Sequence, residues 1–257
     1  MSRIKFMNTE IDNLTMQETL KVIEELIQKN KNAYVVTPNV DHIVQLETNK
    51  ELQAVYENAS LILTDGKPLM WIAKWYGTPI KEKISGSDLF PLLCKMSAEK
   101  GYKMFFFGAA EGVAAKAAEN LSERYKGLQV VGTYSPPYGF EKNQIEMDKI
   151  KEMVKKSAPD ILIVGLGCHK QEKFMYYNCQ NLGVPISFGL GASLDFEAGN
   201  VKRAPKWMAN HGLEWLFRIT QDPKRMAKRY LLNDMKIFAL MFKYWRRDNG
   251  SISKYRN

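Results

Sequence analysis

The chain has 257 residues, 45% hydrophobic and 25% charged, which suits a globular protein with one large domain or one domain plus an appendage. Its net charge of +9 indicates an acidic partner: a nucleic acid, an anionic membrane or a phosphorylated substrate. Three cysteines without CxxC spacing argue against a disulfide framework or a zinc site and favour a reducing cytosol. No signal peptide and no apolar run of roughly 18 residues is found, so we expect any membrane contact to be peripheral.

The first predicted elements are a helix and a strand. Thr15 and Glu18 have the spacing of a capping box, and apolar residues then recur at helical spacing up to Ile27. The β-branched run at residues 33–36 predicts a strand, which stops at Pro38 because proline cannot donate to a sheet ladder.

The same alternation continues along the chain. Further strands are predicted at residues 61–64, 104–107, 129–131, 160–164 and 185–188, and an alanine-rich helix at 113–121. Strands that alternate with helices indicate βαβ units. The predicted fold class is therefore α/β, with a mostly parallel sheet and helices on both faces.

The composition changes after about Gln221. Residues 222–257 hold ten Lys/Arg and three Asp/Glu, which is seven of the nine net positive charges. Basic residues mixed with large apolar ones at helical spacing predict an amphipathic helix that lies on an anionic membrane. The alternative is a helix whose apolar face docks on the core or on a second subunit, which would make a homo-oligomer.

A ligand site is expected where the parallel strands end. Glycine or small polar residues follow each predicted strand, which suits a nucleotide, although glycines also simply end strands. The spacing of GxGxxG is missing after Phe107, as are a Walker lysine motif, HExxH and any His/Cys cluster, so neither a dinucleotide cofactor nor a catalytic metal is expected. Asp195 and Glu197 match an acidic metal motif only weakly.

Asp65 ends an apolar strand and precedes a glycine. It is a candidate general base for an acceptor hydroxyl, or the cap of a helix that begins near Pro68. Gln171 and Glu172 follow another strand end. They bind a sugar or ribose, or form the first turn of a surface helix. His169 has no evident carboxylate partner and is interpreted as a loop residue.

Taken in order, short segments between about residues 35 and 230 resemble the WecG/TagA/CpsF family of bacterial glycosyltransferases, glycosyltransferase family 26. The matching segments are Thr37-Pro38-Asn39, Thr64-Asp65-Gly66, 85–89, Phe107-Gly108, Pro159-Asp160, 165–167, Lys170-Gln171-Glu172, 189–199, Arg203-Ala204-Pro205, 212–215 with Arg218, and 223–230.

The resemblance implies a metal-independent, inverting transferase without a cofactor. Its donor would be a UDP-sugar, its acceptor a sugar on undecaprenyl diphosphate, and its place the cytoplasmic face of the bacterial membrane. The best expectation is transfer of N-acetylmannosamine to N-acetylglucosamine in teichoic acid or other surface-polysaccharide synthesis. Donors with glucuronate, N-acetylmannosaminuronate or galactose, in exopolysaccharide or capsule assembly, are the alternatives.

The resemblance also implies roles for single residues. Asp65 matches the proposed base, Thr37 and Asn39 line the pocket, and Gln171 and Glu172 lie near the donor. The implied fold is a Rossmann-like core, residues 1–200, with a helical appendage, residues 201–257, that completes the site and touches the membrane. Lys83 stands where the family commonly has arginine, and Cys168-His169 where it usually has proline, so the donor sugar is open.

Without a metal, the leaving diphosphate needs backbone N–H groups and cations. The candidate backbone donors are those of residues 108–112, starting at Gly108, and the candidate cations are Lys83, Arg203, Arg218, Arg225 and Arg229, the tail arginines folding over the site. Gly167 is a further candidate substrate-binding residue. Three other functional classes are alternatives to a glycosyltransferase: a non-catalytic nucleotide-binding regulator, a nucleic-acid-binding protein and a dehydrogenase. The clustered basic tail without a nucleic-acid motif argues against nucleic acid as a partner, and the missing fingerprint argues against a dehydrogenase.

Overall fold

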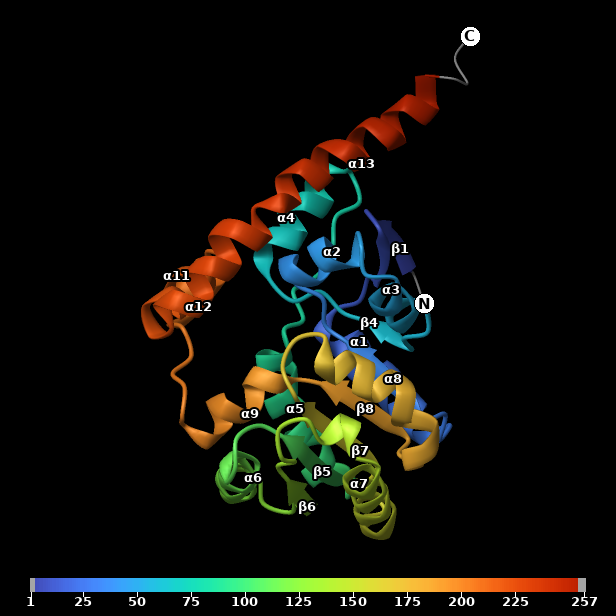
Figure 1. The fold of residues 1–257 in the computed structure, drawn as a ribbon, viewed down its shortest axis with the longest axis vertical. Coiled ribbons are helices and arrows are strands. Elements are labelled where there is room, and N and C mark those ends of the chain that lie inside the picture. The colour runs from blue at the N-terminus through green and yellow to red at the C-terminus, as the bar shows by residue number, and fades with distance from the viewer. Residues whose placement is uncertain (1–2, 254–257) are drawn as a thin grey trace.

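The structure is a computed structural model that describes residues 3–253, without the side chains of residues 206, 210, 225 and 247–253. Its centre is a six-stranded sheet with the order β4-β3-β8-β7-β5-β6, in which each neighbouring pair is parallel (Figure 1). The strands are β3 (Ala33–Val36), β4 (Leu61–Ile62), β5 (Lys103–Gly108), β6 (Gln129–Tyr134), β7 (Ile161–Gly165) and β8 (Ile186–Gly189).

Helices cover both faces of this sheet, as the alternating pattern predicts. Side chains of β5 alternate between two cores: Phe105 and Phe107 belong to one, and Met104 and Phe106 to the other. Both faces are buried, which is typical of parallel sheets. The first core packs against α2 (Val40–Leu46), α3 (Lys50–Glu57), α4 (Lys67–Trp75), α7 (Gln144–Ser157) and α8 (Lys170–Leu182), and the second against α1 (Met16–Gln28), α5 (Gly86–Lys100), α6 (Val113–Arg124) and α9 (Gly191–Ala198).

Most predicted elements are confirmed, with small shifts at their ends. The capping box is present, because Glu18 N–H donates to Thr15 Oγ1 at 3.2 Å and Thr15 N–H to Glu18 Oε2 at 2.7 Å. The strand predicted at 61–64 is shorter, although Leu63 N–H still donates to the Val36 carbonyl at 2.9 Å. The three cysteines are free, as predicted.

An N-terminal hairpin was not predicted. It consists of β1 (Arg3–Phe6) and β2 (Thr9–Asp12), which pair antiparallel. Buried Asp12 attaches the hairpin to the sheet, because its carboxylate accepts from Arg3 and, at 2.9 Å, from the Ile62 N–H beside it.

The C-terminal helices form a tail that leaves the core as a long diagonal (Figure 1). They are α10 (Lys206–Asn210), α11 (Glu214–Gln221), α12 (Pro223–Lys228), a π-helical turn (Arg229–Asp234) and α13 (Lys236–Ser253). One side of α13 docks on the core: Ile237 and Tyr244 are buried, and Tyr76 donates to the Met241 carbonyl at 2.7 Å. Within residues 3–253, every helix is too short or too polar to cross a membrane.

Candidate active site

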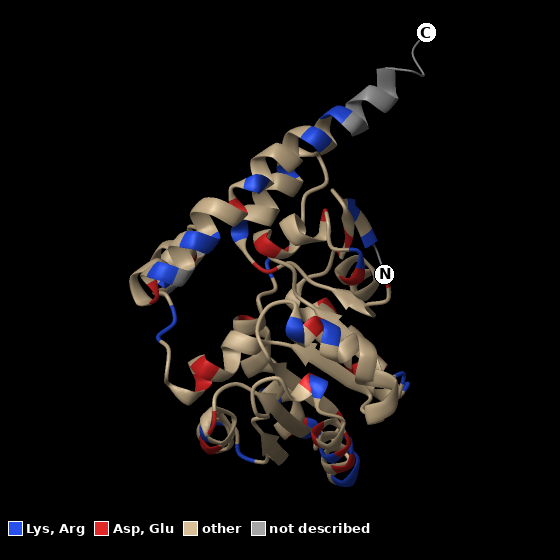
Figure 2. Cartoon of the chain, viewed as in Figure 1, with Lys and Arg blue, Asp and Glu red and all other residues tan. Residues whose placement is uncertain are grey.

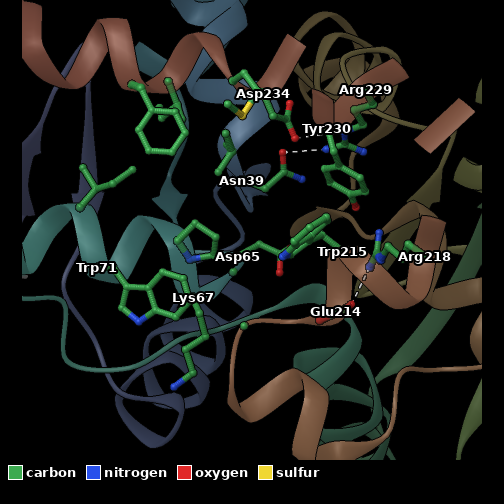
Figure 3. Close-up of a pocket in the computed structure, with 18 of the residues that line it drawn as sticks. Asn39, Asp65, Lys67, Trp71, Glu214, Trp215, Arg218, Arg229, Tyr230 and Asp234 are labelled. Carbon is green, nitrogen blue, oxygen red and sulfur yellow. Dashed lines mark hydrogen bonds and ion pairs between the residues drawn. The ribbon is translucent and has the colours of Figure 1, made fainter. Parts of the chain in front are cut away.

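A cavity of about 480 Å³ lies where β3 and β4 end, and the tail closes its other side (Figure 3). The core and the tail both contribute polar side chains to its wall. From the core these are Asn39, Asp65, Lys67 and Lys83, and from the tail Glu214, Trp215, Arg218, Arg229, Tyr230 and Asp234. The expected location of a ligand site at the carboxyl edge of the sheet thus coincides with a cavity.

Asp65 is held at the edge of the sheet by its backbone. Its N–H donates to the Pro38 carbonyl at 2.9 Å, and Gly66, with φ of 107°, turns the chain into α4. No side chain caps the first turn of α4, so the alternative role of Asp65 as a helix cap is wrong. The structure describes no residue that hydrogen-bonds or ion-pairs with the Asp65 carboxylate, which lines the cavity and is available to a ligand.

The environment of Asp65 makes its carboxyl group a weak acid. Burial, and next the negative charge of Glu214, raise the pKa of Asp65 to about 6, while the charges of Arg218 and Lys83 oppose the rise. A carboxyl group whose pKa lies near the working pH can both accept and release a proton. This property is what a general base needs.

The tail brings a cation and aromatic rings to the same cavity. Arg218 Nη2 lies 2.8 Å from Glu214 Oε1, one helical turn earlier on α11, and its guanidinium lies 5.8 Å from the ring centroid of Phe196 on α9. Trp215 packs edge-on against Tyr230 with 6.0 Å between ring centroids. Figure 3 shows Trp215, Arg218 and Asp65 facing the same space.

Arg229 connects the π-helical turn to the core. Its Nη2 donates to Asn39 Oδ1 at 3.0 Å, and its Nε lies 3.6 Å from Asp41 Oδ2 and 3.9 Å from Asp234 Oδ2. Burial raises the pKa of Asp234 to about 6, although the charge of Arg229 opposes this rise. Asp234 is a second carboxyl group in the cavity, and its position in a basic helical pattern gave no signal in the sequence. π-Helical turns are frequent at functional sites.

The structure brings only part of the predicted set together. Asn39, Asp65, Lys83, Arg218 and Arg229 line the cavity. The lining formed by the described residues does not include Thr37, Gly108, Gly167, Gln171, Glu172 or Arg203, and the side chain of Arg225 lies outside the described ones.

Two of the predicted cations, Lys83 of the core and Arg203 at the start of the tail, hold the same aspartate. Lys83 Nζ lies 2.8 Å from Asp88 Oδ2, and Arg203 donates to the other oxygen, Asp88 Oδ1. Arg203 Nη1 also donates to the Ser87 carbonyl at 3.1 Å. Lys83 therefore borders the cavity while paired, and Arg203 fastens the start of the tail to α5.

Gln171 and Glu172 occupy the first turn of α8, but both side chains face the interior, with exposed fractions of 6% and 1%. Gln171 Oε1 accepts from the Gly191 N–H at 3.1 Å, and its Nε2 donates to Glu172 Oε1 at 3.0 Å. The same Glu172 oxygen lies 3.3 Å from His42 Nε2. Their role at the donor stays a prediction.

The packing of the strands by itself requires a glycine at position 108. With φ of 102°, a Cβ at this position would lie 2.4 Å from the Gly165 carbonyl oxygen. The next N–H, of Ala109, donates to that oxygen at 2.6 Å. A glycine is needed here for the close approach of β5 and β7, and the N–H of Ala109 is already engaged.

The sequence is similar to a known family and to named bacterial proteins. The sequence model described as "Glycosyl transferase WecG/TagA/CpsF family" matches residues 4–251. A protein of Bacillus spizizenii, strain W23, named N-acetylglucosaminyldiphosphoundecaprenol N-acetyl-beta-D-mannosaminyltransferase, is 33% identical over 86% of this chain and 82% of its own. Proteins of the same name from Bacillus subtilis, strain 168, and Staphylococcus aureus, strain MW2, are 28% identical over 82% of both chains and 25% identical over 88% of both.

Proposed function

The chain belongs to the WecG/TagA/CpsF family and is a glycosyltransferase, and from this premise we propose that it transfers N-acetylmannosamine from a UDP-sugar to N-acetylglucosamine on undecaprenyl diphosphate. This choice of sugar and acceptor is supported by the names of the three relatives. The proposed place of the reaction is the cytoplasmic face of the membrane, where such an acceptor is anchored.

The observation that carries the mechanism is Asp65 in the cavity with a pKa of about 6. Asp65 takes the proton of the acceptor hydroxyl as that oxygen attacks the anomeric carbon of the donor. The bond from this carbon to the diphosphate oxygen breaks in the same in-line displacement, so the configuration inverts. General-base assistance of this kind contributes about 10²–10⁴-fold in rate.

The leaving diphosphate requires positive charge, because two phosphate groups gain charge as the bond breaks. Arg218 and Arg229 supply that charge from the tail, and Lys83 from the core. Guanidinium groups bind phosphate oxygens through paired N–H donors, which suits a transfer that needs no metal. Arg225, one turn before Arg229, is included in the proposal by its position in the sequence.

The anionic membrane is proposed as the surface on which the tail lies. Apolar side chains on the outer side of the tail and on α4 are exposed, and several border the cavity. Among them are Trp71 at 54%, Trp75 at 52%, Leu231 at 60%, Leu232 at 63%, Phe238 at 61% and Phe242 at 55%. Figure 2 shows Lys and Arg spread along the same helices. Apolar and basic groups together favour an anionic lipid surface.

In this proposal the two parts of the chain have different roles. Residues 1–200 form the proposed Rossmann-like core with the base, and residues 201–257 form the appendage that completes the cavity and meets the lipid. A lipid-linked acceptor reaches the cavity past Trp71 and Phe238, which belong to both the exposed apolar surface and the cavity wall.

A donor panel tests the function. The purified protein is incubated with a short-chain pyrophosphoryl-N-acetylglucosamine lipid and, one at a time, UDP-N-acetylmannosamine, UDP-N-acetylmannosaminuronate, UDP-glucuronate and UDP-galactose, and products are read by mass spectrometry. The proposal predicts a disaccharide-lipid with UDP-N-acetylmannosamine, formed equally well after treatment with a chelator. Transfer from another donor alone would replace the sugar, and binding of UDP-sugars without any transfer would favour a non-catalytic regulator.

A further inference from the structure

A second group of reactive side chains lies beside the cavity. Two of its members, Cys168 and His169, are adjacent in the sequence, and the third, His42, is distant. His42 is on α2, and Cys168 and His169 form the turn between β7 and α8. Cys168 Sγ lies 3.2 Å from His42 Nε2 and 3.6 Å from His169 Nε2. One ligand atom from each of the three residues lies within 4.8 Å of the others.

Asp41 supplies a fourth possible ligand atom. Its Oδ2 lies 3.4 Å from Cys168 Sγ and 3.7 Å from His169 Nε2. In a tetrahedral zinc site, bonds of about 2.3 Å to sulfur and about 2.0–2.1 Å to nitrogen or oxygen place neighbouring ligand atoms about 3.3–3.6 Å apart. The distances between these protein atoms already approach that geometry.

The second nitrogen of His42 is held as a metal-bound histidine requires. His42 Nδ1 faces Asn39, 3.0 Å from its Oδ1 and 3.3 Å from its backbone N, which leaves Nε2 directed at the thiol. A histidine that ligates a metal through one nitrogen usually donates from the other to a fixed acceptor. The same geometry argues against a thiol–imidazole–carboxylate nucleophile, because Cys168 Sγ and Glu172 Oε1 both approach Nε2 of His42.

The surroundings favour a dication. The carboxylates of Asp41 and Glu172 are 8% and 1% exposed, and Glu172 Oε2 is buried without a hydrogen-bond partner. Arg229, 3.6 Å from Asp41, also reaches Asp234 and Asn39, so its charge is shared. Buried carboxylates are costly unless they are paired, and a bound dication would add to the positive charge that Arg229 and His42 offer them.

His169 has a backbone conformation that side chains rarely adopt. Its φ is 68°, in the left-handed region, and this turn directs its ring to within 5.1 Å of the His42 ring centroid. Non-glycine residues in this region are uncommon, and such strain gathers at functional sites.

We propose that His42, Cys168 and His169, completed by Asp41, bind one zinc-class divalent cation. One thiolate and two imidazoles are ligands that zinc prefers over calcium or magnesium. Binding releases the thiol proton of Cys168 to solvent. None of the three side chains lines the cavity, so the proposed cation site is separate from the cavity assigned to sugar transfer. It ties α2, which Asn39 caps, to the turn before α8. This inference is independent of the proposed function.

Cobalt gives the most direct test, because Co²⁺ occupies zinc sites and reports its ligands. The full-length protein is freed of metal with a chelator and titrated with Co²⁺ under reducing conditions. We expect one Co²⁺ per chain, a sulfur-to-cobalt charge-transfer band and the intense visible bands of tetrahedral coordination. An equivalent of Zn²⁺ should remove both bands. Saturation without a charge-transfer band, or no stoichiometric binding of either ion, would overturn the proposal.

Matched variants locate the site. Cys168→Ala should lose the charge-transfer band and bind Zn²⁺ at least about 10-fold more weakly, since each ligand contributes strongly to affinity. Cys179→Ala and His211→Ala are the controls, and both should keep one Zn²⁺ per chain. Zn²⁺ should also raise the melting temperature of the wild type but not of Cys168→Ala, because a ligand stabilises only the state that binds it. Equal Zn²⁺ affinity in Cys168→Ala and the wild type would refute the assignment. A variant that fails to fold is recognised by its circular dichroism, and His169→Ala then takes its place.

Discussion

Arg229 of the tail donates a hydrogen bond from Nη2 to Oδ1 of Asn39, 190 residues earlier, at a distance of 3.0 Å. Asn39 follows β3 and caps α2, where its side chain accepts from the Asp41 N–H at 3.1 Å. The same amide therefore fixes the end of a core strand and receives the tail. Since the cavity wall is shared between the two parts, the core alone would present an open surface.

The tail arginines should act on the donor diphosphate. Arg218→Gln and Arg229→Gln should each lower kcat/KM for the UDP-sugar by about 10–100-fold, because a hydrogen bond to a charged group contributes about 1.5–3 kcal/mol. Arg124→Gln is the matched control, since exposed Arg124 pairs with buried Glu197 outside the cavity lining, and it should stay within about twofold. Equal rates in all three variants would remove these arginines from the site.

Membrane binding should depend on the exposed apolar residues of the tail. The double variant Leu231→Ser/Leu232→Ser should bind anionic liposomes about 10-fold or more weakly in cosedimentation. Each substitution removes about 1.5–3 kcal/mol that burial of the leucine side chain in lipid contributes. Ile145→Ser is the control, since Ile145 on α7 is 83% exposed but distant from the tail in sequence. If the tail variant sediments like the wild type, the tail is not the membrane-binding surface.

The rate of transfer should follow the titration of Asp65. The base must be ionised, and its pKa is about 6. We expect kcat/KM to fall about 10-fold per pH unit well below pH 6 and to level off above it. The measurement uses both substrates at concentrations well below saturation. If kcat/KM is constant from pH 5 to 8, no group with this pKa has to lose a proton.

The same pKa has a consequence for stability. Between pH 3.8, the ordinary pKa of aspartate, and about 6, the folded chain keeps a proton on Asp65 that the unfolded chain has lost. The free energy of unfolding therefore falls as pH rises through this window. Asp65→Asn, which is always neutral, should be more stable than the wild type at pH 8, by at most about 3 kcal/mol, and equally stable near pH 3. Thermal melting at both pH values measures this, and no gain at pH 8 would contradict it.

Much of the fold follows from local patterns in the sequence. Short apolar runs such as 104–107, each bounded by glycine or proline, predict the parallel strands, and the capping box of Thr15 predicts the start of α1. The N-terminal hairpin was missed because its residues are mixed in polarity and its anchor is a tertiary contact, from Asp12 to the Ile62 N–H. Position at a strand end also predicts Asp65 in the cavity.

Other parts of the site depend on contacts that spacing cannot reveal. Asp234 lies in a basic amphipathic run, and the π-helical turn that directs it inward has no known signal in this pattern. The sequence predicts no His/Cys cluster because no such residues lie close together at metal-ligand spacing. The folded chain does contain one, because it brings His42 next to Cys168, 126 residues away. Gln171 and Glu172 follow a strand end, yet both are buried, and Gln171 is engaged with the Gly191 N–H and Glu172 Oε1, which only the folded chain shows.

Two carboxyl groups with a pKa of about 6, Asp65 and Asp234, line one cavity, and we assign the role of the base to Asp65. The decisive measurement is the single-turnover rate of sugar transfer at pH 8 by the wild type, Asp65→Asn and Asp234→Asn. We expect Asp65→Asn to lose about 10²–10⁴-fold in rate while still binding the UDP-sugar, and Asp234→Asn to stay within about 10-fold. A folded Asp65→Asn with nearly wild-type turnover would contradict the central claim.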